Sequence, residues 1–149
     1  MEDCKVTESF NIWSFGCVLL EFITWQLGGW ELVQEFSRAG ETFNILLFGW
    51  KTDRFYEIFR QVSEGSLSLE SNSALVRVKK EIHQFVNKLH AHKKCSETFH
   101  DLLYFIMEKM LVIESVNLGR RASCNEVHQK LKEHYNRLID PDYVIRPVP

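Results

Sequence analysis

The sequence predicts a mostly α-helical protein, a one-domain helical bundle around a buried central helix. The 149 residues are 45% hydrophobic and include eleven Phe, four Trp and four Tyr, enough for one packed core. Apolar side chains recur at spacings of three and four residues through the second half of the chain, as on helices with one buried face. Residues 11–25 are instead apolar on every side, broken only by Ser14, Glu21 and Thr24. A helix of that kind is expected to lie inside the fold.

The first helix is expected to begin at Ser9, whose side chain suits an N-cap. It runs to Trp25 or Leu27, because the glycine pair at 28–29 is typical of a helix C-terminus. A short amphipathic helix follows and ends at 39–40, where the sequence reads Ala-Gly.

The middle of the chain is less clearly patterned. Residues 43–50 fit either a short strand or a buried helical turn. Thr52 or Asp53 is expected to cap a helix that extends to Val62. Residues 63–73 are rich in Ser, Gly, Glu and Asn, which predicts a flexible loop.

Two regular helices are expected next. An apolar stripe at helical spacing runs from Leu75 to Leu89 over about four turns. Residues 90–95 form a polar connection, and Ser96 then caps a strong helix that carries apolar side chains as far as Leu111.

The last helix opens at Ser123, which forms a capping-box pattern with Glu126. One face of this helix is expected to be apolar, with Val127, Leu131, Tyr135 and Leu138. The chain from Asp140 onward contains three prolines and is predicted to be extended, with residues 144–149 as a tail outside the domain.

Composition limits the possible partners and compartments. Acidic and basic residues are interspersed, the net charge is −2 and no polybasic run occurs, so neither nucleic acid nor a membrane surface is expected as a partner. A membrane span over residues 12–30 is disfavoured by Glu21 at its middle and by the glycine pair near its end. The four cysteines form no CxxC pair, and the N-terminus does not read as a secretory signal. An intracellular protein, cytoplasmic or nuclear, is the prediction.

Several segments resemble a protein kinase. Residues 11–21 look like the central buried helix of the kinase large lobe, with the sequence Asn-Ile-Trp-Ser-Phe-Gly-Cys-Val-Leu-Leu-Glu. Residues 24–30 and 50–58 are similar to the segments that follow this helix in a group of filamentous-fungal kinases. Residues 95–103, followed by Met-Leu-Val-Ile-Glu at 110–114, resemble the penultimate helix, and Arg-Ala-Ser-Cys-Asn-Glu-Val, from Arg121, resembles the opening of the last one. The resemblance implies that residues 1–143 are the C-terminal part of a large lobe.

The resemblance also assigns structural positions. Asn11 stands where the family has an Asp that accepts hydrogen bonds from the catalytic loop, and an amide there carries no charge. Val18 and Phe22 match the base of the apolar column through the ATP site, and both are expected in the core. Arg121 matches the Arg that pairs with the Glu of Ala-Pro-Glu, so it needs solvent, another acid such as Glu114 or Glu126, or a partner chain. The positions carried over are Asn11, Trp13, Gly16, Val18, Phe22 and Arg121.

The nucleotide-binding and catalytic motifs of protein kinases are absent from the sequence. A kinase needs a Gly-rich loop, a strand Lys, a catalytic loop with Asp and Asn, and Asp-Phe-Gly; none occurs here. The chain is therefore predicted to be a catalytically inactive, pseudokinase-like fragment without cofactor, which binds a protein partner or itself through an exposed face of the first helix. One alternative is a truncated piece of a serine/threonine kinase, where ATP and Mg²⁺ belong to the full-length parent. A weaker alternative is an unrelated helical adaptor.

Two further patterns have both a functional and a simpler structural interpretation. His90, His92, Cys95 and His100 are residue types of zinc sites, but their spacing fits no common finger and two lysines lie among them, so a polar loop is preferred and no metal is predicted. The six histidines are all expected on the surface or in loops. Ser123 follows Arg-Arg-Ala and fits a phosphorylation site for basophilic kinases, although its role as N-cap is favoured.

Overall fold

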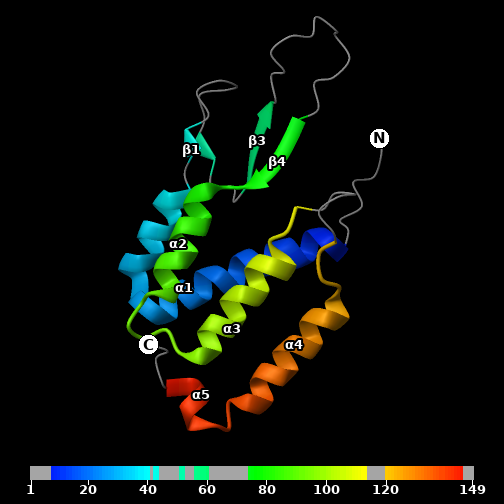
Figure 1. Ribbon diagram of the computed structural model, residues 1–149. Coiled ribbons are helices and arrows are strands. Elements are labelled where there is room, and N and C mark those ends of the chain that lie inside the picture. The colour runs from blue at the N-terminus through cyan, green and yellow to red at the C-terminus, as the bar shows by residue number, and fades with distance from the viewer. Residues whose placement is uncertain are drawn as a thin grey trace, which may run out of the picture.

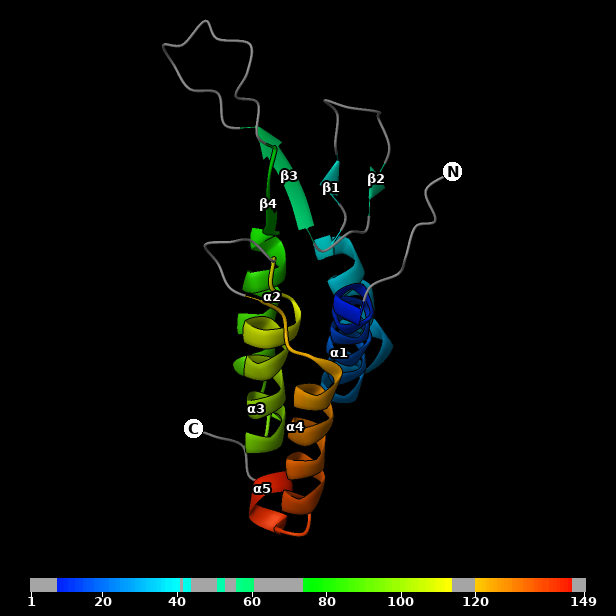
Figure 2. The ribbon, with the colours of Figure 1, turned by 90° about the vertical axis from the view of Figure 1, so that its right-hand side faces the viewer.

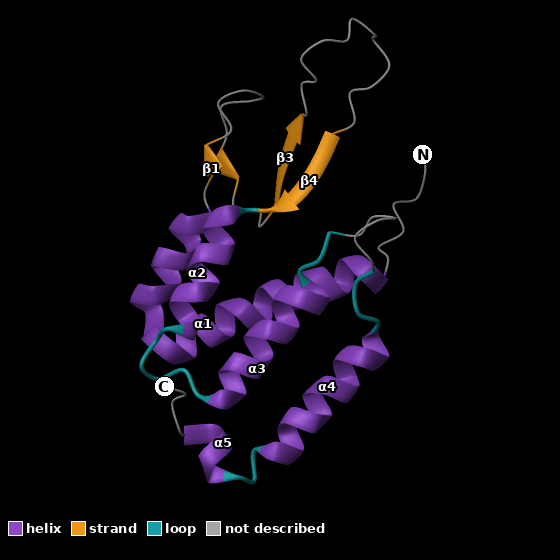
Figure 3. Cartoon of the chain, viewed as in Figure 1, coloured by secondary structure: helices purple, strands orange, loops and turns teal. Residues whose placement is uncertain are grey.

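The computed structural model describes residues 8–40, 42–43, 51–52, 56–60, 74–113 and 120–145. Most of these residues are helical, as predicted (Figure 3). The helices are α1 (Glu8–Gly40), α2 (Lys80–His90), α3 (Glu97–Phe105), a π-helical turn η1 (Ile106–Met110), α4 (Cys124–Arg137) and α5 (Pro141–Ile145). The predicted flexible loop at 63–73 and the ambiguous residues 44–50 lie outside the described part of the chain.

Two short antiparallel strand pairs extend beyond one end of the helices (Figure 1). β1 (Thr42–Phe43) pairs with β2 (Lys51–Thr52), and β3 (Tyr56–Arg60) pairs with β4 (Ala74–Val78). The helix predicted to extend to Val62 is therefore wrong over 56–60, and the helix predicted from Leu75 begins only at Lys80. Tyr56, Ile58, Val76 and Val78 are aromatic or β-branched and lie opposite one another in this ladder, where such residues are favoured.

α1 contains a sharp break at the predicted glycine pair. Gly29 has φ 67° and ψ −160°, a combination open almost only to glycine, and the helix continues directly after it. Leu32 fills the space beside Gly28, where an added Cβ would lie 2.6 Å from the Leu32 Cβ. The glycine pair thus redirects α1 toward α2, so that the second half of α1 lies alongside α2 (Figure 1).

The core lies between α1 on one side and α2, α3 and η1 on the other (Figure 2). α1 contributes one row of buried side chains, which includes Ile12, Leu20, Ile23, Leu27 and Phe36. Thr24 is buried in the same row, and its hydroxyl donates a hydrogen bond to the Leu20 carbonyl at 2.8 Å. A polar residue is therefore tolerated there, because its donor is satisfied inside the helix.

Gly16 marks the closest approach of α1 to the π-helical turn. A Cβ built at this position would lie 3.0 Å from the Met110 Cβ and 3.1 Å from Leu111 Cδ2. Gly16, Met110 and Leu111 are all buried. The absence of a side chain at Gly16 therefore sets how tightly α1 and η1 pack.

Residues 141–145 are helical and not extended as predicted, whereas residues 146–149 of the predicted tail lie outside the described part of the chain. Pro141 opens α5, because proline at the first helical position needs no hydrogen-bonded N–H. Tyr143 is buried, and its carbonyl accepts a hydrogen bond from Thr98 Oγ1 at 2.7 Å, which fixes α5 to the start of α3. In the part of the chain that the structure describes, no helix combines the length and the apolar character needed to cross a bilayer.

Candidate functional site

The side of α1 that faces away from the core carries a row of exposed apolar side chains. Phe15, Val18, Phe22 and Trp25 are 39%, 60%, 52% and 51% exposed, and their spacing of three, four and three residues places them on one face. The Phe22 and Trp25 rings lie 6.1 Å apart, centroid to centroid. We call these four residues the α1 apolar face. Scattered exposed apolar residues are common, whereas a contiguous patch marks an interaction site.

This face corrects two predictions. α1 is not buried on every side, and Val18 and Phe22 are not core residues. The reason is that α2, α3 and η1 all pack on the same side of α1 (Figure 2). A sequence that is apolar all round predicts burial all round only if enough neighbouring chain is present to cover both sides.

Charged residues of both signs lie near the α1 apolar face. α1 contains four glutamates, Glu8, Glu21, Glu31 and Glu35, and a single basic residue, Arg38. Glu21 is exposed within the span of the apolar face, and Glu35, farther along the helix, forms an ion pair with Lys88 of α2. Glu21 therefore places a negative charge within the span of the apolar face, whereas Lys93 and Lys94 line a pocket together with Trp25 at its end.

Arg121 links the start of α1 to the start of α4. Its Nη1 donates to the Ser9 carbonyl at 2.6 Å and to Ser9 Oγ at 2.7 Å, and its Nε and Nη2 donate to the Val112 carbonyl at 3.0 and 2.8 Å. The guanidinium also lies over the Trp13 ring, 5.0 Å from its centroid. Of the two acids named as possible partners of Arg121, Glu126 is bound by Arg120 instead, and Glu114 lies outside the described residues. Of the other positions carried over from the resemblance, Asn11 is exposed and Trp13 is half-buried.

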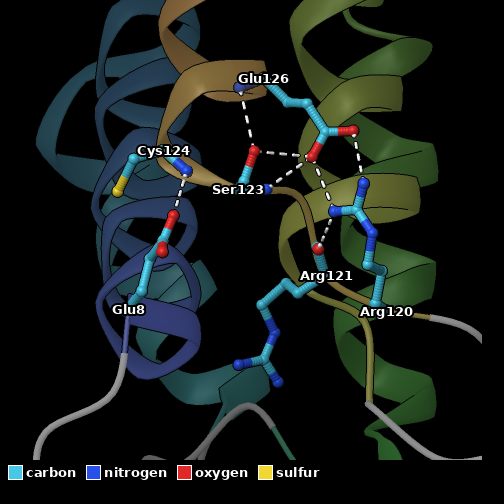
Figure 4. Close-up of polar contacts among 6 residues, drawn as sticks. All are labelled: Glu8, Arg120, Arg121, Ser123, Cys124 and Glu126. Carbon is cyan, nitrogen blue, oxygen red and sulfur yellow. Dashed lines mark hydrogen bonds and ion pairs between the residues drawn. The ribbon is translucent and has the colours of Figure 1, made fainter.

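The predicted capping box at the start of α4 is confirmed (Figure 4). Ser123 Oγ accepts from the Glu126 N–H at 3.3 Å, and the Glu126 carboxylate accepts from the Ser123 N–H at 2.8 Å. Arg120 holds the same carboxylate with two hydrogen bonds, and together with the Ser123 contacts it lowers the pKa of Glu126 to about 2. Glu8 of α1 accepts from the Cys124 N–H at 2.6 Å, which lowers the pKa of Glu8. Two protein carboxylates therefore occupy this helix N-terminus. Phosphorylation of Ser123 stays a prediction.

Three residues of the predicted polar loop form a compact cluster. His90 ends α2, Cys95 lies in the turn and His100 lies in the first turns of α3. Ligand atoms of the three residues all lie within 4.8 Å of one another, and the two histidine Nδ1 atoms are 2.7 Å apart. His92 faces elsewhere and accepts a hydrogen bond from the Lys94 N–H. Sequence spacing alone missed this cluster, because only the turn angle between α2 and α3 brings the two helix ends together.

The prediction that all six histidines lie at the surface or in loops is wrong for His134. It is buried in α4, with Nδ1 hydrogen-bonded to the Tyr143 hydroxyl, and burial lowers its pKa. The expected apolar face of α4 is correspondingly wrong for Tyr135 and Leu138, which are exposed. Docking of α5 decides this outcome, because it covers the His134 side of α4.

No family model, curated protein or solved structure matches this chain.

Proposed function

We propose that the chain is a non-enzymatic helical module that binds a protein partner through the α1 apolar face. The observation that carries this proposal is the row Phe15, Val18, Phe22 and Trp25 on the longest helix, exposed along more than two turns. Aromatic side chains are enriched at the centres of protein interfaces, where they bury large areas at low conformational cost.

The energy available at this face is large enough to matter. Burial of a large apolar side chain contributes about 1.5–3 kcal/mol, and these four side chains are about half exposed, which leaves on the order of 3–6 kcal/mol unused. Association has its own entropic cost, so only part of this energy appears as affinity. The four side chains alone therefore fall short of the about 8 kcal/mol that micromolar affinity requires, so the partner's own apolar face and matched charges must supply the rest.

Charge favours a different chain over a second copy of this one. An antiparallel pairing of two α1 helices about the centre of the apolar face would bring the two Glu21 side chains close together, and like charges at an interface are unfavourable. A partner helix with an apolar face and lysines or arginines along its edges would instead meet Glu21 with opposite charge. We therefore propose a basic amphipathic helix as the occupant.

The sequence segments that resemble a kinase support a more specific version of this proposal. If the chain is a catalytically inactive kinase C-lobe fragment, the positions that carry the apolar column, Val18 and Phe22, are those left uncovered by the missing part of the lobe. A truncated serine/threonine kinase predicts the same exposed face, covered by the rest of its own chain. The helical adaptor alternative is supported by α1 lying at one side of the helices.

A pair of designed peptides tests the proposal. One is a helical peptide with leucines on one face and lysines on its edges, and the other has glutamates in place of the lysines. We expect the lysine peptide alone to bind in calorimetry, with an affinity that falls as salt is raised. Phe22→Lys should abolish binding, whereas Ile139→Lys, at an exposed apolar residue outside this face, should leave it unchanged.

Two results would contradict the proposal. Equal binding of both peptides would show that the charge of Glu21 plays no part. A second copy of the chain would be the occupant if neither peptide binds and sedimentation shows dimers that the Phe22→Lys substitution dissociates.

A further inference from the structure

We propose that His90, Cys95 and His100 form a binding site for a zinc-class divalent metal ion at the joint between α2 and α3. The three residues offer two imidazole nitrogens and one thiolate sulfur, a ligand set that borderline-soft ions such as Zn²⁺ prefer. They come from three consecutive elements, the end of α2, the turn and the start of α3. An ion here would hold the two helices at a fixed angle.

The histidine rings already have the relative position that shared coordination needs. They stack with centroids 4.9 Å apart and planes inclined by 19°, and their Nδ1 atoms lie side by side at 2.7 Å. Zinc–nitrogen bonds of about 2.0–2.1 Å at a tetrahedral angle place two nitrogens about 3.3 Å apart. A small rotation of either ring therefore opens the pair enough to admit the ion between them.

One feature of His100 is unexplained without a ligand. Its Nε2 is buried and has no hydrogen-bond partner among the described residues, while its Nδ1 is hydrogen-bonded to His90 Nδ1. A buried nitrogen without a partner is unfavourable. Either nitrogen of this ring can face the cluster after a ring flip, so a metal ion gives His100 a partner that the described protein atoms do not supply.

Cys95 supplies the third ligand from the interior side. It is almost fully buried, and its backbone N–H donates to the His92 carbonyl at 2.8 Å, which holds the turn in place. Its ligand atom lies within the 4.8 Å group, so movement of about 1 Å brings it to the distance that zinc coordination requires. Binding releases the thiol proton to solvent and leaves the fourth position to water.

The surroundings of the turn between α2 and α3 explain why the sequence spacing predicts a polar loop and not a metal site. His92 is not part of the cluster, and the neighbouring Lys93 and Lys94 are exposed. The lysine charges lie in solvent, where they are screened, and repel a bound cation only weakly. Tyr104 packs against His90, with ring centroids 4.6 Å apart.

Cobalt substitution tests the site in the full-length, reduced and chelator-treated chain. We expect one equivalent of Co²⁺ to bind and to give a thiolate-to-cobalt charge-transfer band. Zn²⁺ should displace the Co²⁺, and binding of Zn²⁺ should raise the Tm of the protein. Cys95→Ser should remove the band, and His100→Gln should weaken Zn²⁺ binding by about 100-fold or more, beyond the effect of losing an outer hydrogen bond.

The matched control is Cys124→Ser, which removes an exposed thiol outside the cluster and should keep band and affinity. If far-ultraviolet circular dichroism shows that Cys95→Ser does not fold, Zn²⁺ binding is measured on His90→Gln instead, which changes a half-buried residue at a helix end. The proposal is overturned if the folded wild type shows no charge-transfer band. It is equally overturned if the folded Cys95 variant, or both histidine variants, bind Zn²⁺ as the wild type does.

Discussion

The two sides of α1 have similar composition and opposite environments. On one side Ile12, Leu20, Ile23 and Leu27 are almost fully buried against α2 and η1, whereas on the other Phe15, Val18, Phe22 and Trp25 remain exposed. Both sides are apolar, so hydrophobicity does not separate them. The buried side has small residues where backbones approach, Gly16 above all, and the exposed side carries aromatic rings instead. The first pattern suits a permanent core, and the second suits an interface with another chain.

The largest expected difference comes from truncating one residue on each side. Leu20→Ala should lower the free energy of unfolding by about 2–5 kcal/mol, because it leaves a cavity in the core. Val18→Ala, two residues earlier and exposed, should change it by no more than about 0.5 kcal/mol. Denaturant unfolding of both variants measures the difference. Similar losses for the two would mean that the α1 apolar face is covered in solution.

The close contact at Gly16 gives the next largest effect. Gly16→Ala should destabilise the fold by about 1–3 kcal/mol, because the new Cβ would press on Met110 and Leu111. Ser37→Ala, at an exposed position of the same helix, serves as the control and should be neutral or slightly stabilising. A neutral Gly16→Ala in thermal unfolding would show that α1 and η1 pack less tightly than described.

The buried His134 predicts a loss of stability in acid. Tyr143 donates its single hydroxyl proton to Asp101, so His134 Nδ1–H donates to the Tyr143 oxygen, and the His134 Nε2 has no partner among the described residues. The charged form is disfavoured, and burial lowers the pKa below that of the unfolded chain.

The unfolded chain therefore binds more protons than the folded one. The stabilising contribution of neutral His134 is complete above the ordinary histidine pKa of about 6.5 and declines as the pH falls from there toward the lowered value. Unfolding titrations from neutral to mildly acidic pH should show this slope, and His134→Gln should reduce it. His128→Gln, at an exposed histidine of the same helix, should leave it unchanged. A slope unaltered in His134→Gln would refute the assignment.

The smallest effect separates two helix starts that look alike in sequence. Ser123→Ala should cost about 1 kcal/mol, because the hydroxyl accepts the Glu126 N–H in the capping box. Ser96→Ala should be neutral or stabilising, because the Ser96 hydroxyl is buried, makes no capping bond and has no partner among the described residues. Urea unfolding of the two variants compares them, and equal losses would contradict the difference.

Local chemistry made part of the fold and site predictable. The Ser123 box, the glycine break in α1 and the helix after Ser96 were all predictable, because each depends on a few neighbouring residues. The β3–β4 pair was missed, since Leu75 to Leu89 also fits a helical stripe and only pairing with Tyr56–Arg60 selects a strand. α5 was missed because its stability comes from Thr98 and His134, both remote in sequence.

The sequence by itself determined that this protein is mainly helical and that its first helix is apolar on every side, because propensity and periodicity act over a few residues. Only the tertiary structure decided which side of α1 is buried, that Arg121 binds Ser9 and Val112, and that His90, Cys95 and His100 meet. These outcomes depend on helix packing and on the angle of one turn. Both are set by contacts between residues distant along the chain, which no local pattern encodes.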